Sequence, residues 1–567
     1  MNQRQQFLQA LRDEPRVNVL IVGGGVNGIG VFRELALQGV DCLLVDRADF
    51  VAGASSNSSR MIHGGLRYLE NREFGLVREA LEERDRLLEN AAHFVSPLKT
   101  TIPLYSRFGG LLRSALVFCG LSGKTGNRGA APVKIGMLFY DFVTRKKRRL
   151  PTHFFSSKEE SLRDIPGLNP EIVATATYYD AWISHTERLC IEMIQDARRA
   201  NDRCYALNYV GVEDRTKKRG TECAQTATHV ELKDELTGET IWIRPSIVIN
   251  ATGAWIDGAN AKLGVKTHFI GGTKGSHLVL DNTELHAALG GRGGRMVYFQ
   301  HSDGRVCIVF PFMDKVIAGT TDIRVSDPDA ARCEESEIEY MLETLRGVFP
   351  KITVAREQIV YTFCGVRPLP ASGDSFTGTI SRGHSVRLIE SSYERSFPIY
   401  CLIGGKWTTF RAFAEQVCDL VLAQFKRKRS AWTAEMPIGG GKGFPTDAAW
   451  KEKWIARVMQ SSDISRERVT DLLERYGAAA EDIAAKLKAQ TDTPLRTLPS
   501  YSAGEIERMA RDEFVEHLDD LVRRRSTIAL LGGARPEVLA EIAAIVGKVL
   551  GWDAKRQAEE IARTERI

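Results

Sequence analysis

The stretch VNVLIVGGGVNG, residues 17–28, decides the fold of this chain. Its first six residues, 17–22, predict a short buried strand, and a helical pattern follows the glycines. Three of these glycines, Gly23, Gly25 and Gly28, fit the spacing GxGxxG. A glycine motif of this spacing between a strand and a helix is typical of the first turn of a βαβ unit.

Each part of this motif has a physical role at a phosphate-binding turn. Gly23 permits the tight turn, Gly25 lets the backbone approach a pyrophosphate, and Gly28 lets the helix pack on the strand. Gly24 and Asn27 lie within the same turn, where the free N–H groups and the positive dipole end of the helix attract anions. The motif therefore predicts a dinucleotide site; the alternative is a glycine-rich turn that binds nothing.

The second strand of this unit ends in an acid. Gly39 ends the helix, residues 41–45 predict a strand, and Asp46 follows it. A carboxylate here accepts hydrogen bonds from ribose hydroxyl groups. Asp46 favours FAD or NAD over a nucleotide with a 2′-phosphate.

A later strand distinguishes an FAD site from an NAD site. Residues 247–250 predict a buried strand that runs into Ala251-Thr252-Gly253. In two-domain flavoproteins a second strand comes close to the cofactor at such a place, and small residues such as Gly253 let the backbone approach. Although the tripeptide alone also suits an ordinary strand-to-turn junction, together with the N-terminal motif it predicts FAD as the cofactor.

Further patterns fix the fold class. Strands are predicted at 276–280, 306–310, 316–319 and 358–363, and a helix at 334–349. We expect an α/β fold: a two-domain FAD-binding flavoprotein, Rossmann-like and of the glutathione-reductase or D-amino-acid-oxidase type. An antiparallel-sheet substrate domain and an all-α C-terminal domain complete it. The predicted regions are an N-terminal extension (1–16), an FAD-dependent oxidoreductase region with interleaved subdomains (17–435), a Gly-rich linker (436–445) and a helical C-terminal domain (446–567).

Composition limits the class of protein. A chain of 567 residues is too long for one core, and a net charge of +5 is too small to predict nucleic-acid binding. The ten cysteines have no metal-ligand spacing, which favours a reducing compartment and predicts no metal site. The N-terminus lacks an apolar signal region, and no stretch reaches the roughly 18 apolar residues of a membrane span.

Several motifs stand in a familiar order along the chain. They are SSNSSR (55–60), IHGGLRYL (62–69), KGSH (274–277), GTTD (319–322), GVRPL (365–369) and GGKWTT (404–409). As a set, from about residue 17 to 425, they resemble the FAD-dependent glycerol-3-phosphate dehydrogenases of the aerobic, quinone-linked type. The helical tail, with Glu513-Phe514 and 523–525 (RRR), is similar to the family's C-terminal domain more loosely.

The resemblance implies a reaction and a location. It implies oxidation of sn-glycerol 3-phosphate at C2 to dihydroxyacetone phosphate, with hydride passing to FAD and electrons to a membrane quinone. It also implies a cytoplasmic protein, peripheral on the inner face of the cytoplasmic membrane. The assembly stays open, with a homodimer as one expectation.

Two histidines are candidates for the base that oxidation of a secondary alcohol requires. His63 is the first, because its ordinary pKa lies near neutrality and the glycines after it leave room for a cofactor. His277 is the second. The alternative for either is a histidine that orders the flavin or a loop.

The phosphate dianion of the substrate needs fixed positive charge, which the planar fork of arginine matches. Arg367 follows a predicted strand and precedes Pro368, which stiffens the turn. Arg67 follows His63 by four residues, and the neighbouring Tyr68 is assigned to the substrate with it. The alternative for either arginine is a structural carboxylate partner.

Two loops complete the predicted site. Gly405, Lys406 and Thr408 lie in a loop that enters a helix, where they would support the flavin ring, and Lys406 adds charge as a third catalytic candidate. The serines of the 55–59 run, Ser55, Ser56 and Ser59, offer donors to the pyrophosphate and the ring, although low-complexity loops have the same composition.

Residues 107–149 form an unusual segment. They hold ten basic residues against the single acid Asp141, interleaved with apolar ones. This pattern suits a segment lying on anionic lipid, where each basic group contributes about 1 kcal/mol. A solvated basic loop is the alternative; a nucleic-acid role fits less well because no binding module accompanies the segment.

One stretch departs from the family. Ser184-His185-Thr186-Glu187-Arg188 replaces the usual acids or amides before the arginine, which puts strict glycerol 3-phosphate specificity in doubt. Three alternatives stay open: the same chemistry on another polyol phosphate such as an erythritol phosphate, an oxygen-reducing oxidase of amino acids or amines, and a non-catalytic flavin-binding interaction protein.

Overall fold

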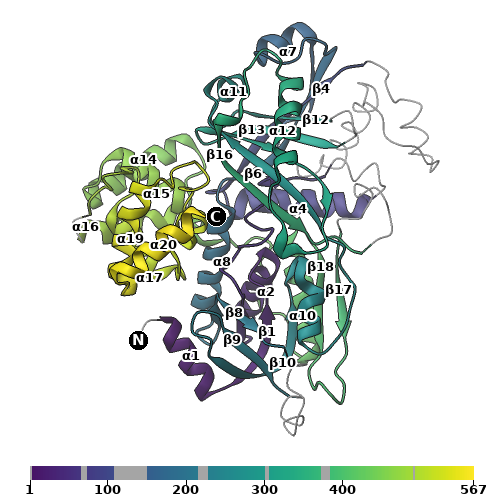
Figure 1. The fold of residues 1–567 in the computed structure, drawn as a ribbon, viewed down its shortest axis with the longest axis vertical. Helices are drawn as coiled ribbons and strands as arrows, with labels where there is room; N and C mark the ends of the chain where they lie inside the picture. The colour runs from purple at the N-terminus through teal and green to yellow at the C-terminus, as the bar shows by residue number, and fades with distance from the viewer. Residues whose placement is uncertain are drawn as a thin grey trace, which may run out of the picture.

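Two β-sheets and a group of C-terminal helices make up the fold of the protein (Figure 1). The structure is a computed structural model that describes residues 3–65, 73–106, 150–214, 228–300, 305–371, 383–489 and 492–566. The candidate residues Arg67 and Tyr68 and the basic segment 107–149 lie outside these ranges.

The first sheet contains the motif strand at its centre. Its order is β17-β18-β10-β1-β2-β7, in which β18, β10, β1, β2 and β7 are parallel and β17 is antiparallel to β18. The bounds are β1 (Arg16–Val22), β2 (Cys42–Val45), β7 (Tyr205–Leu207), β10 (Thr240–Asn250), β17 (His384–Ile389) and β18 (Ile399–Gly404). Strands β8 (Val210–Val212) and β9 (Val230–Asp234) join through β10.

Both faces of this sheet are covered, which explains the apolar run of β1. Val19 and Ile21 pack under α2 (Val26–Leu37), α8 (Thr186–Ala200) and α13 (Phe410–Gln424). Leu20 and Val22 face the other side, with α1 (Gln3–Asp13) and α10 (Ile256–Lys262). A strand buried on both faces needs a nearly continuous apolar sequence rather than an alternating one.

The second sheet is mainly antiparallel, with the order β15-β11-β14-β13-β12-β4-β6-β3. Strand β16 pairs with β11, β5 pairs with β6, and only β4 and β12 among the described pairs are parallel. The bounds are β3 (Met61–Ile62), β4 (Val95–Leu104), β5 (Phe154–Ser157), β6 (Ala174–Ile183), β11 (Thr273–Leu280), β12 (Arg295–Gln300), β13 (Val306–Phe312), β14 (Lys315–Gly319), β15 (Ile323–Arg324) and β16 (Ile359–Arg367). Its helices are α4 (Phe74–Asn90), α7 (Lys158–Asp164), α11 (Thr283–Ala288) and α12 (Glu335–Val348).

The chain passes between the two sheets several times, so the two subdomains are interleaved. The predicted α/β fold class, a Rossmann-like sheet with an antiparallel second sheet and a helical C-terminal domain, is confirmed. The strands predicted from the apolar runs all lie within or closely overlap observed strands.

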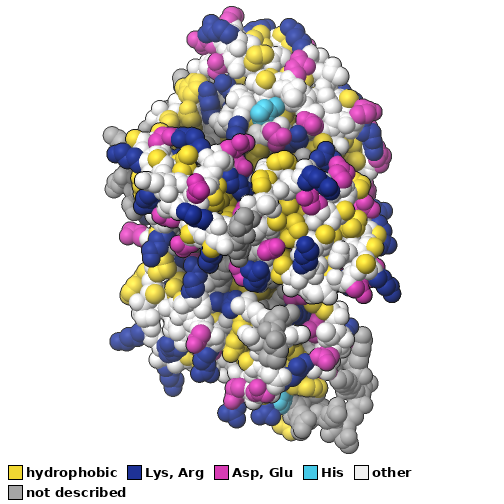
Figure 2. Space-filling view, turned by 90° about the vertical axis from the view of Figure 1, so that its left-hand side faces the viewer, with side chains coloured by type: hydrophobic (Ala, Val, Ile, Leu, Met, Phe, Trp, Pro, Cys, Tyr) yellow, Lys and Arg dark blue, Asp and Glu magenta, His cyan; other side chains and the backbone are white. Residues whose placement is uncertain are grey.

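The C-terminal helices have a core of their own. They are α14 (Ala448–Ser462), α15 (Arg466–Tyr476), α16 (Ala480–Ala489), α17 (Ala503–Asp512), α18 (Leu518–Asp520), α19 (Pro536–Leu550) and α20 (Ala554–Glu565). On the side of the molecule where these helices lie, basic and acidic side chains are interspersed (Figure 2). Such a mixed surface produces no strong field of one sign.

The Gly-rich segment before these helices is packed. Gly439–Gly441 form a short 3-10 helix, η6, and a Cβ on Gly440 would lie 2.0 Å from the carbonyl oxygen of Tyr476. A Cβ on Gly441 would lie 2.4 Å from the carbonyl oxygen of Asn90. The glycines predicted as a linker therefore allow close contact between the two regions that they connect.

Within the described ranges, helices that combine the length and the apolar character of a membrane span are absent.

Candidate cofactor and substrate site

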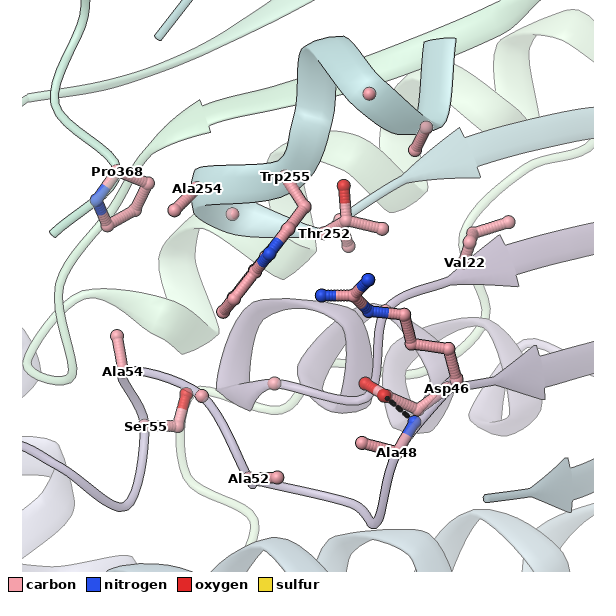
Figure 3. A pocket seen from close by; sticks show the side chains of 18 of the residues that line it. Val22, Asp46, Ala48, Ala52, Ala54, Ser55, Thr252, Ala254, Trp255 and Pro368 are labelled. Carbon is pink, nitrogen blue, oxygen red and sulfur yellow. Dashed lines mark hydrogen bonds between the residues drawn. The ribbon is translucent and has the colours of Figure 1, made fainter. Parts of the chain in front are cut away.

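A cavity of about 490 Å³ opens where β1 and β10 end. These strands are parallel neighbours, with Val22 opposite Asn250, so their carboxyl ends meet at one edge of the sheet. In open α/β sheets ligands bind at this edge. Figure 3 shows Asp46, Ser55, Thr252 and Trp255 around the hollow. The predicted residues Gly23, Gly25, Asn27 and Gly253 also line the cavity.

The motif glycines stand where larger residues do not fit. Gly23 has a φ of +109°, and a Cβ on it would lie 2.6 Å from the carbonyl oxygen of Ala251. A Cβ on Gly28 would lie 2.0 Å from the carbonyl oxygen of Gly23, so the helix packs directly on the turn. Gly25 borders the cavity, and the Oγ of Ser55 is the nearest atom to a Cβ there, at 3.3 Å. This cradle fits a pyrophosphate against backbone.

Asp46 fixes the turn and borders the cavity. Its Oδ2 accepts a hydrogen bond from the Gly24 N–H at 2.7 Å. Its Oδ1 accepts one from the Ala48 N–H at 2.9 Å, which Figure 3 shows as a dashed line. Burial raises the pKa of Asp46 to about 6, against the effect of these two N–H groups. Each carboxylate oxygen has a second lone pair, so the predicted bond to a ribose hydroxyl is compatible with both contacts.

The start of α2 supplies the anion-binding end of the site. Gly25 is the N-cap residue, without a side-chain cap, and the Val26 N–H donates to the Oγ of Ser55 at 3.0 Å. Trp407 holds this serine through a bond from its Nε1 to the Ser55 carbonyl oxygen at 2.8 Å. Ser55 therefore lies at the N-terminal end of α2, and helix ends of this kind attract phosphate groups.

A second cavity of about 230 Å³ continues from the first. The two share the lining residues Val26, Asn27, Ala54, Ser55 and Pro368. The second cavity brings together the predicted residues His63, His277, Arg367, Gly405, Lys406 and Thr408, with Ser59. The two cavities therefore adjoin, and their linings together suit a dinucleotide with a substrate beside it.

The loop before α13 forms one wall of the second cavity. Gly405 has a φ of +98°, and a Cβ there would lie 2.6 Å from Nδ2 of Asn27. Oδ1 of the same asparagine is buried without a hydrogen-bond partner in the described part of the chain. A buried acceptor beside two cavities needs a donor, and FAD would bring one. Thr408 connects this loop to the base candidate, because its Oγ1 accepts a bond from the His63 N–H at 3.2 Å.

His277 is buried and is held through Nε2 and one ring face. Its Nε2 is 2.8 Å from the Oγ of Ser59, and its ring stacks on Phe363 with centroids 4.7 Å apart. Burial, with the charges of Arg367 and Arg60, lowers its pKa to about 3. His277 is therefore neutral at physiological pH and positions Ser59, which matches the alternative of a histidine that orders a loop.

This buried histidine gives a testable pH effect on stability. The unfolded state takes up a proton near pH 6.5 and the native state only near pH 3, so stability falls as the pH drops between these values. Between pH 7 and pH 5 we expect the free energy of unfolding to fall by about 2 kcal/mol more in the wild type than in His277→Gln. Denaturant unfolding at both pH values measures this. Equal losses in the two proteins would contradict the assignment.

Arg367 has a carboxylate partner. Its Nη1 is 3.1 Å from Oδ1 of Asp322, and its Nη2 donates to the Oγ1 of Thr320 at 3.0 Å. The group lies over Gly275, where a Cβ would be 2.1 Å from Nη2. The structure thus shows the ion pair that the sequence left open as the alternative, while it keeps the guanidinium on the cavity wall.

Ser56 and the stretch 184–188 lie away from both cavities. Ser56 donates to the carbonyl oxygen of Gly53 at 3.3 Å and lines neither cavity, so its predicted contact with the cofactor is not supported. Glu187 binds Arg60 at 2.7 Å, and Arg188 binds Glu513 of the C-terminal domain at 2.8 Å. The departing stretch 184–188 therefore packs at a domain contact and lines neither cavity.

Three residues at the first cavity were missed from the sequence. Trp255 donates from Nε1 to Oδ1 of Asp329 at 2.8 Å, and Arg47 forms an ion pair with the same carboxylate. All three line the cavity, and the Cζ of Arg47 lies 5.3 Å from the Trp255 ring centroid. Arg47 and Trp255 could have been found as neighbours of Asp46 and Gly253. Asp329, in the 3-10 helix η3 (Pro328–Ala330), has no such signal.

Comparison with known families covers nearly the whole chain. Residues 18–420 match the family described as FAD dependent oxidoreductase. Residues 431–557 match the C-terminal domain of alpha-glycerophosphate oxidase.

Comparison with individual proteins indicates the same family. The chain is 32% identical over 530 residues to a glycerol-3-phosphate dehydrogenase of Synechocystis sp., covering 91% of this chain and 89% of that one. It is 28% identical over 519 residues to the aerobic glycerol-3-phosphate dehydrogenase of Escherichia coli, covering 90% and 93%. A solved glycerol-3-phosphate dehydrogenase of Bacillus halodurans in complex with FAD shares the fold, with a TM-score of 0.74, 21% identity and coverage of 100% and 97%. FAD is the cofactor, and the chain belongs to the FAD-dependent glycerol-3-phosphate dehydrogenase family.

Proposed function

We propose that the protein oxidises sn-glycerol 3-phosphate at C2 to dihydroxyacetone phosphate. The observation that carries this proposal is the second cavity, where a histidine, an arginine and a lysine from distant segments meet beside the cradle for FAD. The relatives named glycerol-3-phosphate dehydrogenase support the choice of substrate.

The residues that would hold the cofactor follow from the linings. Gly23, Gly25 and Ser55 would bind the pyrophosphate, Asp46 the ribose, and Asn27 the portion between the two cavities. When bound, FAD supplies the acceptor for the hydride that leaves C2.

His63 and Arg367 have separate roles toward the substrate, one in proton transfer and one in phosphate binding. His63 would accept the proton of the C2 hydroxyl, because the other histidine of the cavity, His277, is within hydrogen-bond distance of Ser59. Arg367 would bind the phosphate, and its ion pair with Asp322 fixes the plane of the guanidinium before the substrate arrives. Lys406 would add positive charge on the same wall, where it favours the anionic substrate and the negative charge that develops during reduction.

The electron acceptor and the location of the protein follow from the type of enzyme that it resembles. We assign a membrane quinone as acceptor and a peripheral site on the inner face of the cytoplasmic membrane, with the basic segment 107–149 as the contact. The resemblance to the aerobic type of this family and the composition of that segment support this assignment.

An anaerobic flavin spectrum tests the reaction. The FAD-loaded protein is expected to lose its oxidised flavin band when sn-glycerol 3-phosphate is added. If the band persists with sn-glycerol 3-phosphate but disappears when an erythritol phosphate is added, the substrate is another polyol phosphate. A band that no polyol phosphate changes would contradict the proposal and favour a non-catalytic flavin protein.

Replacing Arg367 by methionine tests the phosphate assignment. Loss of charged hydrogen bonds to the substrate is expected to raise the KM for sn-glycerol 3-phosphate about 10- to 100-fold, with FAD content unchanged. Steady-state kinetics of FAD-loaded protein measures this. Arg295→Met is the matched control, because Arg295 also pairs with an aspartate, Asp164 at 3.0 Å, and lines neither cavity. An unchanged KM in Arg367→Met would contradict the assignment.

A further inference from the structure

The loop 46–53 has two faces. Asp46, Arg47, Ala48, Ala52 and Gly53 line the first cavity. Asp49 and Phe50, between them, are buried and point the other way, into the C-terminal domain. The same short loop therefore touches both the cofactor site and the helical domain, which contributes no residue to either cavity lining.

Asp49 is clamped by two arginines of the C-terminal domain. Its Oδ2 accepts from Nη1 of Arg525 at 2.8 Å and its Oδ1 from Nη2 at 2.7 Å, while Arg524 donates through Nε. Both arginines lie in the π-helical turn η8 (Leu521–Arg525), and the side chains of Asp49 and Arg525 are completely buried. Burial alone would raise the pKa of Asp49, but the charges of Arg525 and Arg524 lower it instead. The carboxylate is thus ionised and depends on the arginines.

Phe50 carries the contact on to the glycine motif. Its ring meets Phe514 of the C-terminal domain edge to face, with centroids 5.4 Å apart. The Cδ1 of Phe50 fills the space beside Gly24, where a Cβ would be only 2.5 Å away. The next residue, Val51, donates its N–H to the Gly24 carbonyl oxygen at 2.8 Å. Phe50 therefore connects Phe514 of the C-terminal domain with Gly24 of the glycine turn, and Val51 holds the loop to the same glycine.

We propose that the C-terminal domain positions the FAD-binding loop through the clamp of Asp49, Arg524 and Arg525, so that FAD binding and docking of this domain strengthen each other. Asn208 also donates to Oδ1 of Asp49, at 2.8 Å, but an amide does not replace two cations. A carboxylate buried without its cations is costly, so undocking of η8 destabilises this conformation of the loop. Coupling between two binding events is reciprocal, so FAD must stabilise the docked domain by the same factor. Asp49 is a positioning residue in this scheme.

The first test measures FAD affinity. Apoprotein is titrated with FAD, and Asp49→Asn is expected to bind it at least 10-fold more weakly than the wild type. Arg292→Met is the matched control. It breaks another ion pair between the domains, Arg292 with Glu474 at 2.6 Å, and within the described part of the chain neither partner bonds to the loop 46–53 or to η8. The control is expected to keep its Kd for FAD within twofold of the wild type.

The second test measures the reverse direction. In the wild type, FAD is expected to slow amide hydrogen exchange in α17 to α20, and in Asp49→Asn this protection is expected to disappear. If Asp49→Asn does not accumulate as folded protein, Arg524→Gln replaces it, because Arg525 still pairs with Asp49; a 3- to 10-fold loss of FAD affinity is then expected. An unchanged FAD affinity in the folded variant, or an equal loss in Arg292→Met, would overturn the proposal. Neither readout involves substrate, so failure here is separate from failure of the proposed reaction.

Discussion

Gly28→Ala is expected to yield a protein that retains no FAD through purification and has lost about 3 kcal/mol of stability. The added Cβ would lie 2.0 Å from the carbonyl oxygen of Gly23 and 3.2 Å from the Cβ of Ala251. The first of these atoms belongs to the backbone of the turn, so no side-chain rotation can relieve the clash. The turn must open, and Gly23, Gly25 and the start of α2 then leave the cavity wall together.

Flavin absorbance per protein and denaturant unfolding measure this result. Gly347→Ala is the matched control, since a Cβ on this glycine of α12 meets nothing within 4 Å. Alanine is the better helix former, so the control is expected to gain up to about 1 kcal/mol and to keep its FAD. Stoichiometric FAD in Gly28→Ala would show that the turn tolerates a shift, and would remove the steric argument.

His63→Asn is expected to slow anaerobic flavin reduction by sn-glycerol 3-phosphate by about 10²- to 10⁴-fold, the usual contribution of a general base. FAD should stay bound, because the contact of residue 63 with the cofactor loop runs through its backbone N–H, which donates to Thr408. The side chain can therefore change without loss of that bond.

Stopped-flow measurement of the flavin band, in protein of equal FAD content, records the rate of reduction. His286→Asn is the control: its Nε2 is 2.9 Å from the carbonyl oxygen of Met313, outside both cavities. A near-normal rate in His63→Asn would remove this histidine as the base. The second candidate, His277, would then remain, with a pKa lowered to about 3 that makes it a weak proton acceptor.

The sequence predicted much of the first cavity, because its chemistry is local. The strand, turn and helix of 17–28 and the acid at residue 46 lie within one βαβ unit, and the structure places Gly23, Gly25, Asn27 and Asp46 on one wall. The apolar run of β1 predicted a buried strand for the same reason, and the structure shows it buried on both faces. The family resemblance then predicted that motifs far apart in the chain share one site. The structure places His63, Arg367 and Lys406 from these motifs in the lining of the second cavity.

The partners of individual side chains could not be predicted in this way. Ser55 and Ser56 are adjacent serines, yet one caps α2 at the cavity and the other turns to the Gly53 carbonyl. Arg188 looked like part of a motif that affects specificity, and the structure shows it bound to Glu513. Both outcomes depend on what packs against the segment, and that information lies elsewhere in the chain.

By itself, then, the sequence determined the dinucleotide turn and the fold class, since steric demands at glycines and apolar periodicity are recorded in neighbouring residues. Only the tertiary structure decided that Ser59 holds His277, that Asp322 pairs with Arg367, and that Asp49 is clamped by Arg525. The physical reason is distance along the chain. A hydrogen bond or ion pair needs two side chains within about 3 Å, and folding of the whole chain determines which distant groups meet at that range.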